Sequence, residues 1–505
     1  MKVKNYLKLI SVLLTLILAL SVFSGCKKKK PTEEKPQDTS DETEVDDGFE
    51  KDDLPKTMDF GTKKINMMIC LGGYENFYQE KATPEVVSNQ VFLATQRVEE
   101  RLNVSLKFID NSFTWDNRGS VYSKICNDIR MQVSECDIIA GHPYIPMYGG
   151  TELFTDLSTL KNVNLDKSWY DQGMRSVWGE KIYCIRAEGA IRNIQNLACT
   201  FFNQDALDRV GIDENLYDTV YNGEWTLEKM KTLIENTWVS NDTEVSADDS
   251  FGATFSDGNA FTPFGISLGV RLYERQDDGS YVYNASSERN ITIMDAIKKF
   301  VNNNENVLSS YNRESEDYKI TTENGIGVSR IFAEGRSLFT FGCFGHAGVI
   351  LDQDVISNKS LGILPYPKFD STQTDYASAV NNVGVCFYIP TTASDLDCAG
   401  AVLEAWNSDF HRNAVPLYFE TMLKIRYSSG GEMSAMFDFI RSKLTCTFEY
   451  MFEDPDIMTM GSGAIKSMIS GQKGLTSWRV IAKSNENVAN MELKNIMIKY
   501  GIISE

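Results

Sequence analysis

Positions 98–108 carry the stretch VEERLNVSLKF, in which the end of an amphipathic helix runs directly into a strand. Upstream of it, an apolar stripe at helical spacing begins at Val91 and ends at Leu102, and Ser88 is expected to cap this helix. The second half of the stretch alternates between apolar and polar residues, as a half-buried strand does. The stretch therefore predicts a helix followed at once by a strand.

The segments on either side extend this alternation. Residues 64–71 form an apolar run that predicts a buried strand ended by two glycines. Apolar residues at helical spacing mark 121–129 as a helix, and 136–140 predict a further strand. The order strand, helix, strand, helix, strand indicates a parallel sheet covered by helices, which is an α/β fold.

Weaker signals continue the pattern toward the C-terminus. Thr226 and Ser394 are each expected to begin a helix, and the last amphipathic stripe runs from Ala489 to Tyr500. Residues 277–280, Asp-Asp-Gly-Ser between apolar runs, predict a hairpin. The polar stretch 239–261 is expected to be a loop.

The N-terminus carries an export signal. Three lysines precede an apolar run at 9–20, which is shorter than the roughly 20 residues of a membrane span. Small residues then lead to Cys26, and this arrangement resembles the lipobox of bacterial lipoproteins, in which the cysteine is acylated. The acidic segment that follows, 31–53, offers little to bury and is expected to be a disordered tether. The alternative is an uncleaved anchor; both interpretations place the remaining chain outside the cytoplasm.

Charge and cysteine content exclude several classes of protein. The formal net charge is −20, which argues against a nucleic-acid partner. Nine cysteines follow Cys26 with no C-x-x-C pair and no zinc-ligand spacing, and they are expected to be buried free thiols.

Catalytic motifs are weak. Residues 265–269 match G-x-S-x-G, but a hairpin signal follows where a hydrolase needs a helix after its serine. The three histidines, His142, His346 and His411, have no metal-ligand spacing, and no phosphate-binding loop occurs. We therefore expect no catalytic residue, metal or cofactor. A surface glycoside hydrolase or esterase remains an alternative, because two carboxylates placed by the fold leave no sequence signature. A sensor or adhesion lipoprotein is a further alternative.

Seven segments, in order, resemble the extracellular solute-binding proteins of ABC importers, in the sugar-binding group that includes maltose-binding protein. They are 98–104, 136–139, 201–212, 224–230, 332–339, 361–368 and 387–406. The resemblance implies a two-lobed periplasmic-binding-protein-like fold with a hinge and a ligand cleft between the lobes. It implies the following division: a signal peptide at 1–25, the lipidated Cys26 and tether at 26–57, lobe one at 58–185 plus 380–435, and lobe two at 186–379 plus 436–505.

The same resemblance implies a monomeric lipoprotein on the extracellular face of the membrane that passes its solute to permease subunits. Ligands of α/β sheets bind where strands end, which points to the segments 141–148 and 192–195. The expected ligand-binding residues are Tyr144, Asn193, Phe344, His346, Tyr376 and Asn381. Because the chain shows aromatic residues in irregular segments and no cluster of arginines, a neutral mono- or oligosaccharide is the expected solute.

Overall fold

The computed structural model divides into two compact units, Met1–Gly48 and Phe49–Glu505. It describes residues 48–71, 77–240, 248–255, 260–309, 326–352, 355–357, 360–380, 384–423, 431–452, 458–469 and 477–504. Cys26 and the predicted signal peptide lie outside the described residues. The following description concerns the second unit.

The first of two five-stranded sheets contains the stretch that decides the fold. Its strand order is β2 (Val104–Asp110), β1 (Lys63–Ile69), β3 (Ile138–Gly141), β12 (Cys386–Tyr388) and β4 (Ile185–Arg186). β1 is parallel to both β2 and β3, with Lys63 opposite Val104 and Met67 opposite Ile138. The predicted parallel arrangement is therefore confirmed, while β12, from much later in the chain, runs antiparallel to β3 and β4.

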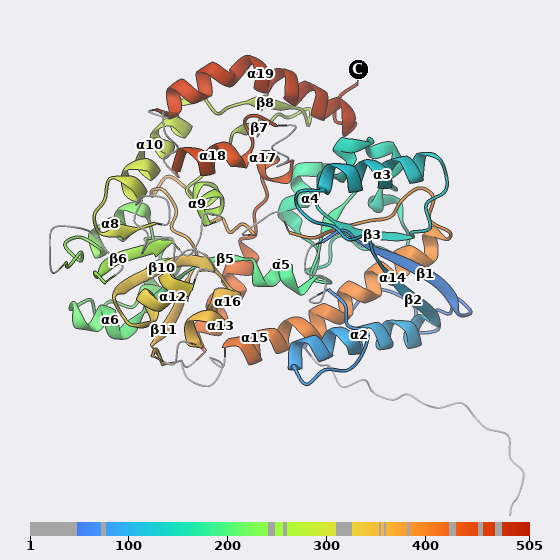
Figure 1. Cartoon of the computed structure of the whole chain (residues 1–505), viewed down its shortest axis with the longest axis horizontal. Helices are drawn as coiled ribbons and strands as arrows, with labels where there is room; N and C mark the ends of the chain where they lie inside the picture. The colour runs from blue at the N-terminus through green and yellow to red at the C-terminus, as the bar shows by residue number, and fades with distance from the viewer. Residues whose placement is uncertain are drawn as a thin grey trace, which may run out of the picture. The chain divides into compact units, whose positions relative to one another are not determined.

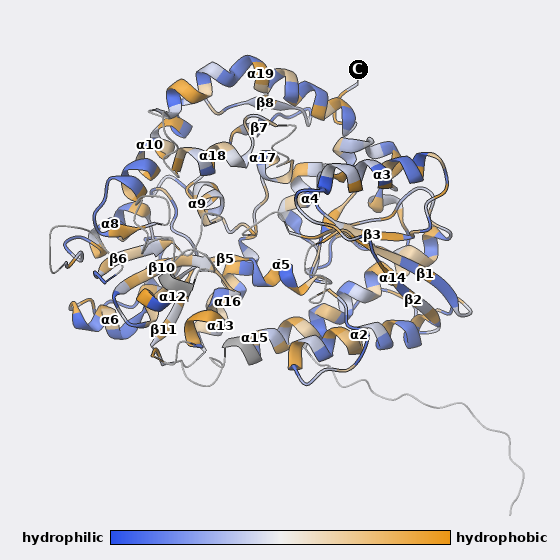
Figure 2. Ribbon diagram, in the orientation of Figure 1, coloured by the Kyte–Doolittle hydropathy of each residue, from blue (hydrophilic) through white to orange (hydrophobic). Residues whose placement is uncertain are grey.

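Helices cover both faces of this sheet. Figure 1 shows α3 (Arg118–Arg130) on one side and α2 (Val86–Leu102) with α14 (Leu396–Asp409) on the other. α2 buries a stripe from Val87 to Leu102, and its outer face is hydrophilic (Figure 2). The helix leaves through Asn103, which takes a left-handed conformation and turns the chain directly into β2.

Two predicted helix caps are wrong by one to three residues. Glu85, not Ser88, caps α2, because its carboxylate accepts hydrogen bonds from the backbone N–H groups of Val87 and Ser88. Asp395, next to Ser394, caps α14 through the Cys398 N–H. The Ser394 hydroxyl instead donates to Asp137 at 2.7 Å. The predicted Thr226 cap is confirmed, since its hydroxyl accepts from the Lys229 N–H at 3.2 Å.

The second sheet is mixed. Its order is β11 (Leu361–Leu364), β5 (Ala198–Asn203), β10 (Ser337–Cys343), β6 (Phe251–Phe255) and β9 (Val307–Leu308). β10 is parallel to β6 and antiparallel to β5. The loop predicted at 239–261 is therefore wrong for β6, whose five residues are all buried. Phe251 and Phe255 give this short strand enough apolar surface to outweigh its polar surroundings.

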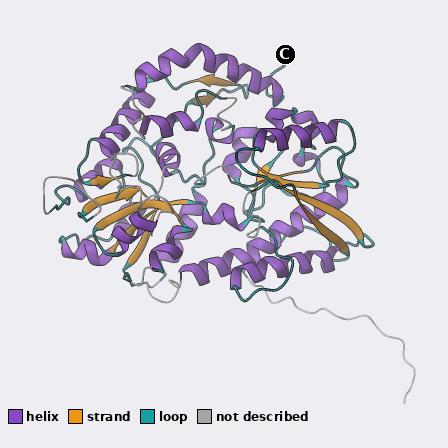
Figure 3. Ribbon diagram, in the orientation of Figure 1, coloured by secondary structure: helices purple, strands orange, loops and turns teal. Residues whose placement is uncertain are grey.

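The remaining elements surround the two sheets (Figure 3). The predicted hairpin is confirmed as β7 (Tyr273–Arg275) and β8 (Tyr281–Tyr283). The further helices are α4 (Gln172–Trp178), α5 (Ile191–Gln195), α6 (Gln204–Arg209), α7 (Leu216–Tyr221), α8 (Leu227–Leu233), α9 (Phe261–Ser267), α10 (Glu288–Asn302), α12 (Ile326–Ala333), α13 (His346–Leu351), α15 (Val415–Leu423), α16 (Glu432–Ser442), α17 (Phe448–Met451), α18 (Ser462–Ile469) and α19 (Trp478–Lys499).

Residues 49–54 form a strap at the start of the second unit, so the disorder predicted for 31–53 is wrong for residues 49–53. Asp52 forms a two-pronged ion pair with Arg101 of α2, in which Nη1 lies 2.7 Å from Oδ2. Glu50 accepts a hydrogen bond from the Ser168 N–H at 3.0 Å, and Lys167 donates to the Lys51 carbonyl at 2.7 Å. These partners belong to α2 and to the segment before α4, so the strap is attached to the elements around the first sheet.

The nine cysteines after Cys26 are all buried and free, as predicted. Burial raises the pKa of the Cys70 thiol to about 12, so this thiol stays protonated at neutral pH. Among the described residues, no helix has the length and apolarity needed to cross a membrane.

Candidate functional site

Three parallel strands of the first sheet end at one edge, and the chain that follows each of them lines a common pocket. Its volume is about 170 Å³. We call it the strand-end pocket; its lining residues are Leu71, Phe113, Trp115, His142, Arg192, Asn196, Gly384 and Val385. Leu71, Phe113 and His142 follow β1, β2 and β3, respectively. This edge is where α/β sheets bind their ligands.

Trp115 provides an accessible aromatic surface at this pocket. It remains 44% exposed, although most large rings nearby are buried. The guanidinium carbon of Arg118 lies 4.5 Å from the centre of the Trp115 ring, and Arg118 donates from Nη1 to the Trp115 carbonyl at 3.0 Å. These two contacts hold the indole in place while part of it stays open to solvent.

His142 forms the floor of the pocket as a neutral ring. Its Nδ1 shares a hydrogen bond of 2.5 Å with the Tyr122 hydroxyl, and its ring stacks on Tyr144 with centroids 5.3 Å apart. Burial, together with the positive charges of Arg192 and Arg118, lowers the pKa of His142 to about 3. The ring is therefore uncharged at neutral pH.

The opposite wall comes from α5 and from the chain before β12. The Asn193 side chain holds these two segments together: its amide donates to the carbonyls of Ala187 and Val385 at 2.7 and 2.9 Å, and its oxygen accepts from the Val385 N–H at 2.7 Å. Gly384 has φ +77°, and a Cβ there would lie 2.9 Å from the Asn193 oxygen. Asn193 thus positions Arg192 on α5 without itself lining the strand-end pocket.

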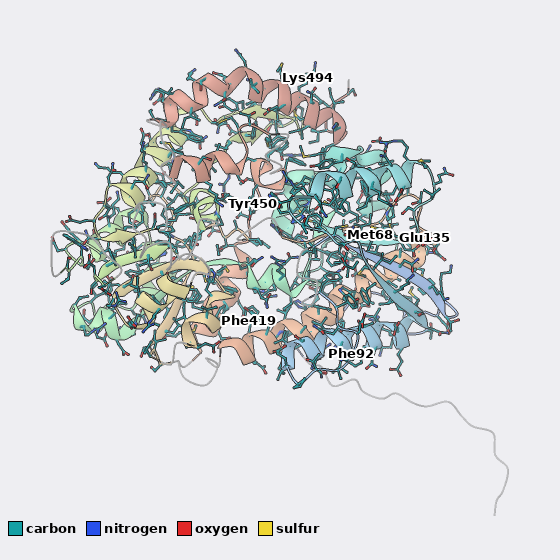
Figure 4. The ribbon with its side chains drawn as sticks, in the orientation of Figure 1. Met68, Phe92, Glu135, Phe419, Tyr450 and Lys494 are labelled. Carbon is teal, nitrogen blue, oxygen red and sulfur yellow. The ribbon has the colours of Figure 1, made fainter. Side chains whose placement is uncertain are left out.

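The residues predicted from the sequence to bind ligand occupy different environments. Tyr144 and Phe344 have no exposed surface, and Tyr376 is 6% exposed. Phe344 packs on Phe437 and on Phe419, which is labelled in Figure 4. The Tyr376 hydroxyl accepts from the Trp225 N–H at 3.1 Å. In this structure, these three rings pack within the protein, and none of them lines the strand-end pocket.

The two remaining predicted residues are His346 and Asn381. His346, at the start of α13, is partly buried and accepts at Nδ1 from the Cys343 N–H at 3.1 Å. Asn381 lies outside the described residues. His142 and Arg192 do fall within the segments expected to carry the pocket loops, 141–148 and 192–195. Trp115 and Arg118 were not predicted, although Trp115 follows β2 as a pocket residue should.

A second and larger pocket, of about 410 Å³, lies along α16. We call it the α16-side pocket. Arg186 and Asp171 form an ion pair in its wall, with side chains 3% and 2% exposed. Glu188 accepts from Arg441 and from His411, whose Nδ1 is 2.7 Å away. Burial alone would raise the pKa of Glu188, but Arg441 and His411 outweigh it and lower this pKa to about 2.

The G-x-S-x-G segment lies inside the core. Ser267 ends α9, is 1% exposed, and donates from its hydroxyl to the Phe264 carbonyl at 2.8 Å. It therefore has neither the strand-to-helix turn nor the exposure of a hydrolase nucleophile. Among the described residues, no group of His, Cys, Asp or Glu is arranged to hold a metal ion.

No protein-family profile and no curated protein matches the sequence. Among solved structures, the chain is similar to the galacto-N-biose-/lacto-N-biose I-binding protein of the ABC transporter from Bifidobacterium longum, in complex with lacto-N-biose. The TM-score is 0.52 at 12% identity, covering 88% of this chain and 98% of that chain. Maltose-bound MalE3 of T. maritima has a TM-score of 0.49 at 12% identity, covering 86% and 100%. The first similarity confirms the predicted α/β fold, which this chain shares with the Bifidobacterium longum protein.

Proposed function

We propose that this chain is a solute-binding protein that captures a carbohydrate outside the cell and delivers it to an ABC transporter. The observation that carries the proposal is the position of Trp115 at the edge where three parallel strands end. Its indole ring is held by Arg118 and remains 44% exposed. A sugar presents C–H patches to such a ring, while Asn196 and Arg192 offer hydrogen bonds to its hydroxyl groups. The structural neighbour from Bifidobacterium longum, which binds lacto-N-biose, supports the same class of ligand.

The proposal includes how the protein is held and with what it works. Cys26 is acylated and anchors the chain to the extracellular face of the membrane, and the chain between Cys26 and the strap serves as the tether. Permease subunits receive the solute from a monomer. The lobes comprise 58–185 with 380–435 and 186–379 with 436–505. Two observations favour this division: β12 joins the first sheet, and β5, β6 and β9–β11 form the second.

A binding role is favoured over hydrolysis. The only motif of a hydrolase in the sequence, at 265–269, has its serine buried and bonded to its own helix. The strand-end pocket combines aromatic, arginine and amide side chains, and among its described lining residues there is no nucleophile paired with a base. We therefore expect a bound sugar to be recovered unchanged.

A thermal-shift screen over mono- and oligosaccharides, followed by calorimetry on the hits, tests the proposal. A ligand at a hundredfold excess over its Kd should add about 2.7 kcal/mol to the free energy of unfolding. Trp115→Ala should weaken binding at least about tenfold. Tyr221→Ala removes a 50% exposed ring on α7 and should leave affinity unchanged. Failure of every carbohydrate to bind, or equal affinities for wild type and Trp115→Ala, would overturn the proposal.

A further inference from the structure

We propose that the saccharide held at the strand-end pocket is anionic, carrying a ring carboxylate or a sulfate, and that Arg192 with Arg118 recognises this group. The inference rests on the proposed function and names the chemical class of its ligand. It replaces the neutral sugar that the sequence alone suggests.

Two arginines lie at the edge of the first sheet that forms the strand-end pocket. Arg192 lines the pocket from α5, whereas Arg118 begins α3 and lies against Trp115, which lines the same pocket. Their positions in the sequence give no arginine cluster, but the fold brings both to the same edge of the first sheet. One guanidinium group can donate two parallel hydrogen bonds to two oxygens of the same carboxylate or sulfate, a geometry that a neutral hydroxyl group does not match.

The charge at the strand-end pocket is positive, although the formal net charge of the protein is −20. None of the described residues that line the strand-end pocket carries a carboxylate. The charges that lower the pKa of His142, after burial, are those of Arg192 and Arg118, so the field at the floor of the pocket is positive. A positive pocket on an acidic protein concentrates anionic ligands and repels none of the neutral ones.

Neutral and anionic sugars differ in the hydrogen bonds that they accept from a guanidinium. A neutral hydroxyl group accepts a single hydrogen bond from a guanidinium, whereas a carboxylate or a sulfate accepts paired, charge-assisted hydrogen bonds that are about twice as strong. The partly exposed ring of Trp115 offers a stacking surface for the sugar ring, and Arg192, which lines the same pocket, offers donors for a charged substituent. The pocket therefore offers one element for the sugar ring and another for its charge.

The test uses the full mature chain and pairs of ligands that differ only in charge. Uronate oligosaccharides are compared with their methyl esters, and sulfated oligosaccharides with their desulfated counterparts, by calorimetry. We expect at least one charged member to bind at least about tenfold more tightly than its neutral partner. This preference should shrink between about 0.02 M and about 0.5 M sodium chloride, because salt screens the interaction. The arm that shows it identifies carboxylate or sulfate.

Three variants assign the effect. Arg192→Gln should bring the ratio of charged to neutral affinity close to one, and Arg192→Lys should retain part of the preference. Arg479→Gln removes the same charge from an exposed ion pair between Arg479 of α19 and Glu288 of α10, and it should leave the ratio unchanged. Circular dichroism and the melting temperature check that each variant folds.

The outcomes separate the two proposals. If neutral sugars bind and no charged member is preferred, the anionic ligand is ruled out while the carbohydrate function stands. A preference that survives intact in a folded Arg192→Gln also overturns the inference. If no carbohydrate of either kind binds, the proposed function itself fails.

Discussion

The strand-end pocket and the α16-side pocket lie against different sides of α5, and they differ in the charges of their lining residues. Arg192 and Asn196 line the smaller one, while Asn193 and Ile194 line the larger one. In the larger pocket the charges are compensated internally, by the ion pairs Arg186–Asp171 and Glu188–Arg441. In the smaller one, the described lining residues bring positive charge and an exposed ring, with no carboxylate.

This difference in charge shows that the larger cavity volume does not by itself identify the binding site. A pocket whose ions satisfy one another is a means of holding segments of the chain together, because a ligand there would have to compete with interactions already made. A pocket that is lined by a partly exposed ring and by an arginine, with no carboxylate among its described lining residues, offers a stacking surface and hydrogen-bond donors to a ligand. The predictions below test this distinction, beginning with the α16-side pocket.

Removing one member of the most deeply buried ion pair should have the largest effect. Asp171→Ala leaves the Arg186 guanidinium buried without its partner and removes the cap that accepts from the Met174 N–H, so we expect a loss of about 3–5 kcal/mol. Unfolding in urea, followed by fluorescence, measures it. The control is Asp128→Ala, which breaks the exposed pair with Lys124 and should cost about 0.5 kcal/mol or less. Equal losses would mean that the pair in the α16-side pocket is not structural.

Glu188→Gln should have the next largest effect and should be pH-dependent. The pKa of Glu188 is about 2 in the folded protein, against about 4.3 for an unfolded glutamate. Its carboxylate therefore stabilises the fold above about pH 4.3, and this contribution is lost as the pH falls toward 2. At pH 7 we expect the variant to be less stable by about 1–3 kcal/mol. Melting curves between pH 7 and pH 3 should show the gap between wild type and variant narrowing; a constant gap would contradict the assignment.

Trp115→Ala, by contrast, should hardly change the stability of the empty protein. Because the ring is 44% exposed, we expect a change within about 1 kcal/mol, despite the loss of sugar affinity predicted above. Chemical denaturation without ligand checks it. A loss as large as that of Asp171→Ala would show that Trp115 is a packing residue, and the distinction between the two pockets would disappear.

The smallest expected effect is none at all. Since the pKa of His142 is about 3, its ring does not change charge between pH 5 and pH 8. An ordinary histidine, with a pKa of about 6.5, would change charge within this range. The affinity for a saccharide found in the screen should therefore be flat over this range. An inflection near about pH 6.5 that disappears in His142→Gln would show that the ring is charged in the usual range.

Local periodicity was enough to predict most of the fold. The stripe on α2 and the alternation in β2 are properties of neighbouring residues, and both elements form where the sequence places them. Prediction failed where a contact decided the outcome: β6 forms in a polar stretch because Phe251 and Phe255 are buried, and Glu85 caps α2 because its longer side chain reaches the free N–H groups.

The candidate site was predicted only in part, for a physical reason. The segments after strands can be read from the sequence: 141–148 and 192–195 contain His142 and Arg192, although neither residue was itself predicted to bind ligand. The exposure of a side chain cannot be read in this way. Tyr144 and Trp115 both lie in irregular segments, but the Tyr144 ring has no exposed surface and the Trp115 ring is 44% exposed. The approach of Arg118 to the pocket that Arg192 lines depends on the packing of α3, which no local pattern encodes.

The strap at residues 49–54 has a mechanical consequence. It is attached through Asp52 to Arg101 and through Glu50 to Ser168, so tension in the chain before residue 49 enters the molecule through α2 and the segment before α4. Those elements belong to the first sheet, which also carries the strand-end pocket. The strap therefore passes a pull on the chain before residue 49 to α2 and to the segment before α4.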